Sequence, residues 1–87
     1  MTVYIDKMNI PYGRMIMCHM LADSRKELDD IAHKIGLNKK WIQYPGTYKE
    51  HYDICLQYKN KALEAGAIEI SRKQVALILK KKRTHYV

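Results

Sequence analysis

The sequence predicts an α/β fold, in which a single small domain contains a mixed sheet of four to five strands and three helices. Three observations predict it. Short apolar runs rich in β-branched residues alternate with segments that have the apolar periodicity of helices. Serine capping boxes at Ser24 and Ser71 mark helix starts, and Gly36 and Gly66 mark helix ends. Residues 1–87 are therefore predicted to form one α/β domain that ends in a basic tail.

The first strand is predicted over residues 2–6, with Tyr4 and Asp6 on one of its faces. A loop over residues 7–14 is expected to follow, because this segment contains a proline and a glycine. The loop ends by presenting Arg14 beside the next strand. Arg14 is therefore a candidate anion-binding residue, or else a solvated arginine at the start of a strand.

The second strand is predicted over residues 15–21 and is apolar on both faces, which is typical of a central strand covered on two sides. His19 lies inside this run, and Asp23 lies at its exit, where a helix is expected to begin. A histidine titrates near neutral pH. The C-terminal end of this strand is therefore the first place to expect a functional site.

A helix over residues 24–35 and a third strand over residues 41–44 follow. The helix has the length of a right-handed crossover, so we expect the second and third strands to be parallel. The C-terminal ends of these two strands would then share one edge of the sheet. Further elements are predicted as a strand over 51–54, a helix over 56–65, a strand over 67–70 and a helix over 72–82.

If the strand over residues 51–54 returns antiparallel, His51 reaches the edge that carries His19 and Asp23, and Asp53 shares its face. The predicted ligand-binding residues are Arg14, His19, Asp23, Trp41, His51, Tyr52 and Asp53. Two uses of these groups remain open. One is a divalent metal held by His19, His51 and Asp53, and the other is proton transfer by one pair while Arg14 holds an anion. Each residue also has a structural alternative: a helix cap for Asp23, a core histidine for His19, and a turn contact for the Tyr-Asp pair.

The net charge of +7 is concentrated near the C-terminus, since no acidic residue follows residue 70. The candidate nucleic-acid contacts are Lys80, Lys81, Lys82 and Arg83. The alternative is that these cations stabilise a helix C-terminus and keep the protein soluble. Cys18 and Cys55 are expected to be reduced, and we expect a cytoplasmic protein without a membrane-spanning segment.

The strings PYGRMIMCHMLAD, WIQYPGT, HYDI and ALEAGAIEI, with an ELxxIAxxIGL helix, resemble a small phage and bacterial family, domain of unknown function number 4031. The resemblance extends to about residue 79, and the lysine-rich tail lies outside it. The family pattern maps onto His19, Asp23, His51, Tyr52, Asp53, Gly66 and Ala67. It supports the domain boundary and the polar group, and it implies no activity.

The function that the sequence favours is a binding module for a phosphate-bearing ligand, either a nucleotide or a nucleic acid, at the His/Asp edge. Two further functions remain open. One is a small metal-dependent hydrolase or phosphoesterase, whose site could be shared by a homodimer because the chain is short. The other is a phage-type interaction module that docks on a host protein.

Overall fold

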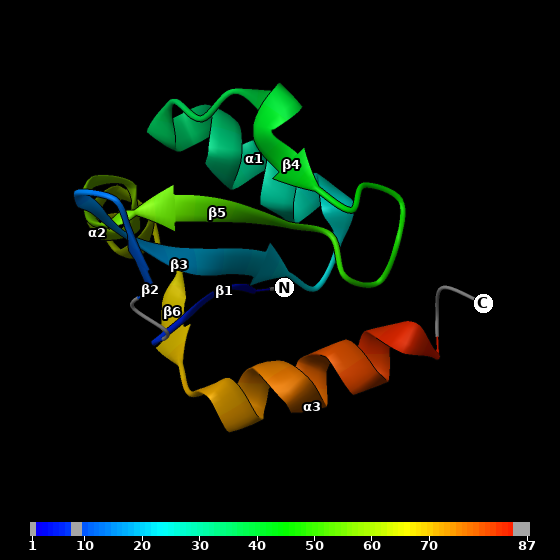
Figure 1. Ribbon diagram of the computed structural model, residues 1–87. Helices are drawn as coiled ribbons and strands as arrows, with labels where there is room; N and C mark the ends of the chain where they lie inside the picture. Colours follow the sequence, from blue (N-terminus) through cyan, green and yellow to red (C-terminus); the bar gives the residue numbers. More distant parts are fainter. Residues whose placement is uncertain (1, 8–9, 85–87) are drawn as a thin grey trace.

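The strand β3 (Met15–Ala22) lies at the centre of the molecule, and the other elements are arranged around it (Figure 1). The computed structural model describes residues 2–7 and 10–84. The other elements, in chain order, are β1 (Val3–Asp6), β2 (Ile10–Tyr12), α1 (Arg25–Ile35), the short 3-10 helix η1 (Lys39–Trp41), β4 (Ile42–Gln43), β5 (His51–Cys55), α2 (Leu56–Glu64), β6 (Ile68–Ile70) and α3 (Arg72–Arg83).

The strands form one mixed sheet, in which β4, β5, β3, β1 and β6 lie side by side in that order. The pair β1 and β6 is parallel, and the other neighbouring pairs are antiparallel. The short strand β2 pairs with the N-terminal half of β3, outside this row of five. The predicted α/β class, with one mixed sheet and three α-helices, is confirmed.

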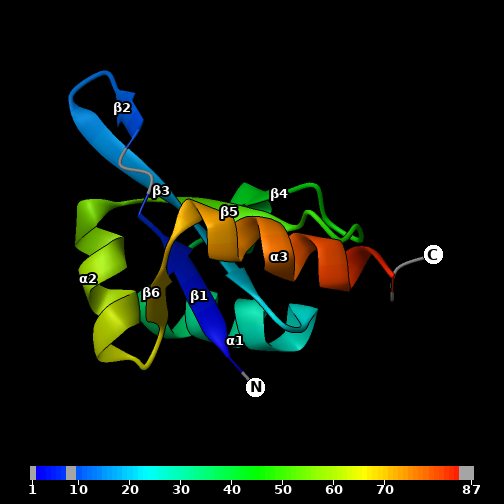
Figure 2. The same cartoon turned by 90° about the horizontal axis from the view of Figure 1, so that it is seen from below.

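Helices lie on both faces of this sheet (Figures 1 and 2). The helices α1 and α2 pack against the apolar face, where Ile5, Met20 and Tyr52 are completely buried. The helix α3 crosses the opposite face, which Figure 2 shows from below. The two faces therefore differ in character: one forms the hydrophobic core, and the other carries polar side chains beneath a single helix.

The helix ends follow the sequence signals. The side chain of Ser24 accepts a hydrogen bond from Glu27 N, and Ser71 forms a complete capping box with Gln74. Gly36 ends α1 in the left-handed conformation, with a φ of 87°. The predicted helices are confirmed. The longest of them, α3, has 12 residues, and no helix of the described chain is long and apolar enough to cross a membrane.

The predicted loop over residues 7–14 contains the strand β2, which the sequence pattern did not indicate. Pro11 suggested a loop, but β2 pairs only with β3 and a proline is tolerated in such an edge strand. The hairpin of β2 and β3 projects from the body of the molecule (Figure 2). Met15 and Ile16 are consequently exposed, so only the C-terminal half of β3 is covered as predicted.

The strands β3 and β4 are both antiparallel to β5 and so run in the same direction, as the crossover argument predicts. They are not neighbours, because β5 lies between them. The strand β4 contains only Ile42 and Gln43, and Trp41 belongs to η1 rather than to a strand.

Both cysteines are free thiols, as predicted, and burial raises the pKa of Cys18 to about 11.

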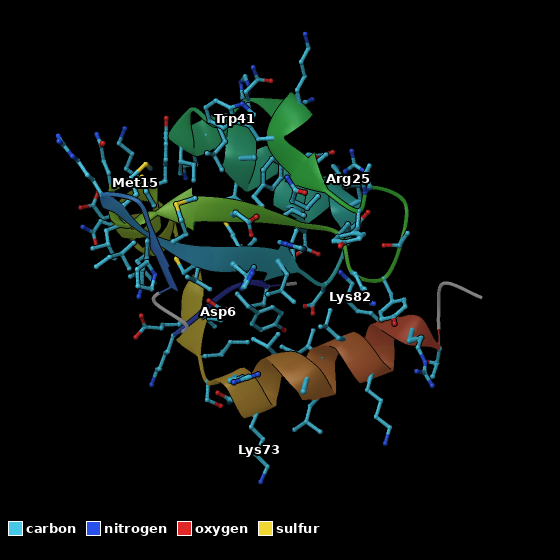
Figure 3. The ribbon with its side chains drawn as sticks, in the orientation of Figure 1. Asp6, Met15, Arg25, Trp41, Lys73 and Lys82 are labelled. Carbon is cyan, nitrogen blue, oxygen red and sulfur yellow. The ribbon has the colours of Figure 1, made fainter. Side chains whose placement is uncertain are left out.

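The basic run Lys80–Arg83 is the last turn of α3 rather than a separate tail, and residues 85–87 of the predicted tail lie outside the described residues. Lys82 differs from its neighbours because it is only 6% exposed and points toward the sheet (Figure 3). Its Nζ donates a 2.7 Å hydrogen bond to Ala22 O. Burial lowers the pKa of the Lys82 ammonium. Lys82 therefore fixes α3 to β3 and is not available to bind nucleic acid.

We expect Lys82→Ala to lower the free energy of unfolding by roughly 1.5–3 kcal/mol, because it removes a buried, charge-assisted hydrogen bond. The matched control is Lys81→Ala, since Lys81 is exposed on the same helical turn. That change should stay within about 0.5 kcal/mol of the wild type. Urea denaturation of the three proteins measures the difference, and equal stabilities would show that Lys82 does not anchor α3.

Candidate functional site

The face of the sheet beneath α3 carries a group of polar side chains from three adjacent strands. In the register of the sheet, His19 of β3 lies directly opposite Asp53 of β5. His51 lies two residues before Asp53 and so shares its face. Asp6 of β1 lies on the other side of His19, and Figure 3 shows it between the sheet and α3. Alternation along three strands thus brings two histidines and two carboxylates together.

Asp6 holds His19 through two hydrogen bonds. Asp6 Oδ2 lies 2.6 Å from His19 Nδ1, and Asp6 Oδ1 accepts a 2.9 Å hydrogen bond from the His19 backbone N. Asp6 is only 1% exposed, whereas the His19 side chain is one-third exposed. The hydrogen bond to Asp6 raises the pKa of His19, and burial opposes this effect. Because a carboxylate can only accept, Nδ1 carries the proton, and the ring is fixed with Nε2 free to face Asp53.

His51 is oriented in the same way by a different acceptor. Its Nδ1 lies 2.7 Å from Lys49 O, so this nitrogen carries a hydrogen and donates a hydrogen bond to the carbonyl oxygen. The Nε2 of His51 then lies 3.2 Å from Asp53 Oδ1, and the Nε2 of His19 lies 3.5 Å from the same oxygen. In their neutral forms both imidazoles present an acceptor to a carboxylate. Three acceptors that converge on one point attract a cation, either a proton or a metal ion.

We call His19, His51 and Asp53 the His–Asp cluster. One potential ligand atom from each of the three lies within 4.8 Å of the other two. The separations of 3.2 and 3.5 Å from Asp53 Oδ1 are close to the roughly 3.3 Å expected between ligands of a tetrahedral zinc ion. Asp6 and the Lys49 carbonyl correspond to the acceptors that orient metal-bound histidines in known sites. The cluster is therefore a candidate metal centre.

The structure brings His19, His51 and Asp53 together, but it does not add Asp23 to them. Asp23 Oδ1 accepts a 2.9 Å hydrogen bond from Tyr4 Oη, and its Oδ2 accepts a 3.1 Å hydrogen bond from Thr2 N. The prediction that Asp23 joins this site is wrong. Because β1 pairs with the end of β3, Thr2 and Tyr4 lie beside Asp23 and donate hydrogen bonds to its carboxylate.

Tyr52 also differs from its predicted role as a ligand-binding residue. It is completely buried on the opposite face of the sheet, where its hydroxyl lies 3.3 Å from Asp29 Oδ1. Tyr52 alternates with His51 and Asp53 along β5, so it must point the other way. It belongs to the hydrophobic core.

Arg14 and Trp41 lie at other places on the molecule. Arg14 is exposed in the turn between β2 and β3, before β3 begins. It does not line any of the described cavities. Trp41 is half-exposed and lines a separate cavity that also touches Asp53. Of these two predicted residues, only Trp41 is therefore a neighbour of the cluster.

Asp6 is the functional residue that the sequence reasoning missed. The sequence does contain a signal for Asp6. It is a carboxylate at the end of a predicted strand, on the face opposite the β-branched residues, and the structure shows that it is buried. Its partner could not be inferred, since that requires knowing that β1 lies beside β3 in an antiparallel arrangement. Arg72 was also missed as a site residue, and it lines the cavity described below.

The ion pair of Asp6 and His19 predicts a pH-dependent stability in the metal-free protein. The folded state holds the pKa of His19 above 6.5, chiefly through the hydrogen bond to Asp6. A raised histidine pKa stabilises the fold below the unfolded pKa, and this contribution is lost as pH rises through the folded pKa. We therefore expect this contribution to the free energy of unfolding of chelator-treated protein to be lost as the pH rises above about 6.5.

The variant Asp6→Asn tests this prediction, because asparagine keeps the shape and an acceptor for His19 N but removes the charge. Its stability should be lower than that of the wild type at about pH 6 and should depend less on pH. Urea denaturation at each pH measures both. The same decline with pH in both proteins would contradict a contribution from this ion pair.

A family model described as "Protein of unknown function (DUF4031)" matches residues 3–82. The resemblance that the sequence motifs indicate is thereby confirmed, and the match includes Asp6 and the whole His–Asp cluster. The match ends at residue 82 rather than at about residue 79, so Lys80, Lys81 and Lys82 lie inside it. No curated protein and no solved structure matches the chain.

Proposed function

This chain belongs to the DUF4031 family of proteins of unknown function, and we propose from its His–Asp cluster that it is a hydrolase dependent on one divalent metal ion. The observation that carries the proposal is the shared orientation of the two histidines. In both rings Nδ1 is held by a fixed acceptor, and in both rings Nε2 faces Asp53 Oδ1. A purely structural pair of surface histidines has no need of two such supports.

The ligand set favours a transition metal of the zinc type. Two imidazole nitrogens and one carboxylate are the protein ligands of several catalytic zinc sites, and they leave the fourth position open. Calcium and magnesium prefer oxygen ligands, so an arrangement with two histidines does not suit them. The same three ligand types also bind iron(II) in oxygenases, and metal analysis distinguishes that alternative.

The chemistry of such a centre follows from its ligands. A divalent ion would be held by His19, His51 and Asp53, and it would supply Lewis-acid chemistry that activates water. Asp6 raises the pKa of His19 and fixes the orientation of its ring, and the Lys49 carbonyl fixes the orientation of the His51 ring. Hydrolysis consumes one water: its oxygen bonds to the electrophilic centre of the ester, the bond to the alcohol oxygen breaks, and the alcohol leaves with a proton.

Metal analysis of protein purified without a histidine tag tests the proposal. We expect one equivalent of zinc per chain after incubation with zinc and gel filtration, and its loss after treatment with a chelator. The loaded protein should also hydrolyse at least one of three chromogenic esters: 4-nitrophenyl acetate, 4-nitrophenyl phosphate or bis(4-nitrophenyl) phosphate. Failure to retain zinc, iron, manganese, nickel or cobalt would overturn the proposal.

A second candidate is the binding of a phosphate-bearing ligand, such as a nucleotide or a nucleic acid, without a reaction. It is favoured by Lys49 and Arg72, two cationic residues that line one cavity with His19 and His51. This function does not require a metal. Equal binding of inorganic phosphate by metal-free and zinc-loaded protein, with no ester hydrolysis, would favour the second candidate over the first.

A further inference from the structure

A cavity of about 360 Å³ lies between the sheet and α3, and we call it the α3 cavity. Its floor includes His19 and His51, two members of the His–Asp cluster, and its size is typical of a site for a small molecule. Any ligand in the α3 cavity therefore lies next to the candidate metal centre. The remaining walls show what kind of ligand this space suits.

Two cationic residues line the α3 cavity. Arg72 is the first residue of α3, and Lys49 lies in the loop before β5. Within residues 2–7 and 10–84, Arg72 forms no ion pair with a carboxylate. The one carboxylate among the described lining residues is Asp6, which is buried and bound to His19. An anion is therefore favoured here, and a guanidinium suits a phosphate group in particular.

The wall of the α3 cavity that faces the sheet is apolar. It is formed by Val75, Ala76 and Leu79 of α3, and Leu21 of β3 adds apolar surface on the floor beside His19. A free phosphate ion would leave this wall exposed to water. A ligand that joins a phosphate to an apolar group would cover it and gain from the burial of apolar surface.

Tyr44 adds an aromatic surface to the lining of the α3 cavity. Its ring stacks on His51, with ring centroids 6.0 Å apart and planes inclined by 30°. Its backbone has a φ of 52°, which is unusual for a residue with a bulky side chain. The Thr47 hydroxyl holds this conformation through a 2.8 Å hydrogen bond to Tyr44 O. The ring is exposed, so its outer face is open for a second aromatic ring to stack on it.

We propose that the α3 cavity binds a small phosphate monoester of an aromatic alcohol. The proposal rests on the metal-dependent hydrolase described above and names its substrate class. Arg72 and Lys49 bind the phosphate beside the metal, and the aromatic group lies between Tyr44 and the apolar wall of α3. In the reaction, the oxygen of water bonds to phosphorus, the bond from phosphorus to the aromatic oxygen breaks, and the products are phosphate and the protonated alcohol.

Isothermal titration calorimetry with metal-free protein, which cannot hydrolyse the ester during the titration, tests this substrate class. We expect phenyl phosphate to bind about tenfold more tightly than inorganic phosphate, because its ring covers the apolar wall. The variant Arg72→Gln should weaken phenyl phosphate binding by roughly 10- to 100-fold and leave zinc affinity unchanged. Lys73→Gln is the matched control, since Lys73 follows Arg72 in the same helical turn but points away from the sheet (Figure 3). It should bind phenyl phosphate like the wild type.

A second variant tests the apolar wall. Ala76→Phe places a ring in the cavity from an exposed position of α3, so the fold should tolerate it. We expect it to remove the preference for phenyl phosphate over inorganic phosphate, and to slow the hydrolysis of 4-nitrophenyl phosphate. The same preference in Ala76→Phe as in the wild type would overturn the assignment of the aromatic group to this wall.

The two proposals fail in different ways. If the protein retains no metal, the hydrolase proposal itself is wrong. If it retains zinc but Arg72→Gln binds phenyl phosphate as the wild type does, only the substrate class is wrong. Tight binding of a single-stranded oligonucleotide, without measurable binding of phenyl phosphate, would also overturn the substrate class and favour a polymeric ligand.

Discussion

Replacing His51 by alanine is expected to lower the affinity for zinc by about 100-fold or more, because it removes one of three protein ligands. The Nε2 of His51 lies 3.2 Å from Asp53 Oδ1. The fold should tolerate the change, since His51 lies at the start of β5 and its side chain is partly exposed. Competition titration with a chromogenic zinc chelator measures the affinity.

The matched control is His33→Ala. His33 is exposed on α1, on the far side of the sheet from the His–Asp cluster, and should bind zinc only weakly. We expect this variant to keep the affinity of the wild type. An equal loss of affinity in both variants would point to non-specific binding by surface histidines, and an unchanged affinity in His51→Ala would remove His51 from the site.

Replacing Tyr52 by alanine is expected to destabilise the protein by roughly 3–5 kcal/mol, which is a large part of the stability of a domain this small. The side chain is completely buried in the core between the sheet and α1, so its loss leaves a cavity. The milder variant Tyr52→Phe loses only the hydrogen bond to Asp29, and about 1 kcal/mol is expected. Chemical denaturation compares the three proteins.

The two Tyr52 variants also test whether Tyr52 is a core residue or a ligand-binding residue. We expect Tyr52→Phe to bind zinc and phenyl phosphate with the affinities of the wild type, because the ring faces away from the His–Asp cluster. A clear loss of ligand affinity in Tyr52→Phe, with little loss of stability, would restore the role that the sequence predicted for it.

The parts of the fold that could be predicted from the sequence are those set by neighbouring residues. The helices follow from caps such as Ser24 and Ser71 and from apolar periodicity, both of which act within a few residues. His19, His51 and Asp53 meet because two strands alternate their side chains and pair antiparallel. Predicting that pairing requires only the assumption that the strand over residues 51–54 runs antiparallel to β3.

The parts that could not be predicted depend on long-range neighbours. Asp23 was expected at the site, but the placement of β1 beside β3 gives it Thr2 and Tyr4 as partners. The same placement brings Asp6 to His19. Lys82 looks like part of a solvated charge run, and only the packing of α3 over the end of β3 explains its burial. Periodicity within one segment carries no information about such contacts.

The parallel pairing of β1 with β6 has a consequence for folding kinetics. It places residue 4 beside residue 68, and contacts between such distant parts of a chain form slowly because closing a long loop costs entropy. During synthesis, β1 can pair with β3 early, but its other edge stays open until β6 has emerged. A chain interrupted before residue 68 would therefore present an unpaired strand edge, and we expect such a fragment to aggregate through that edge.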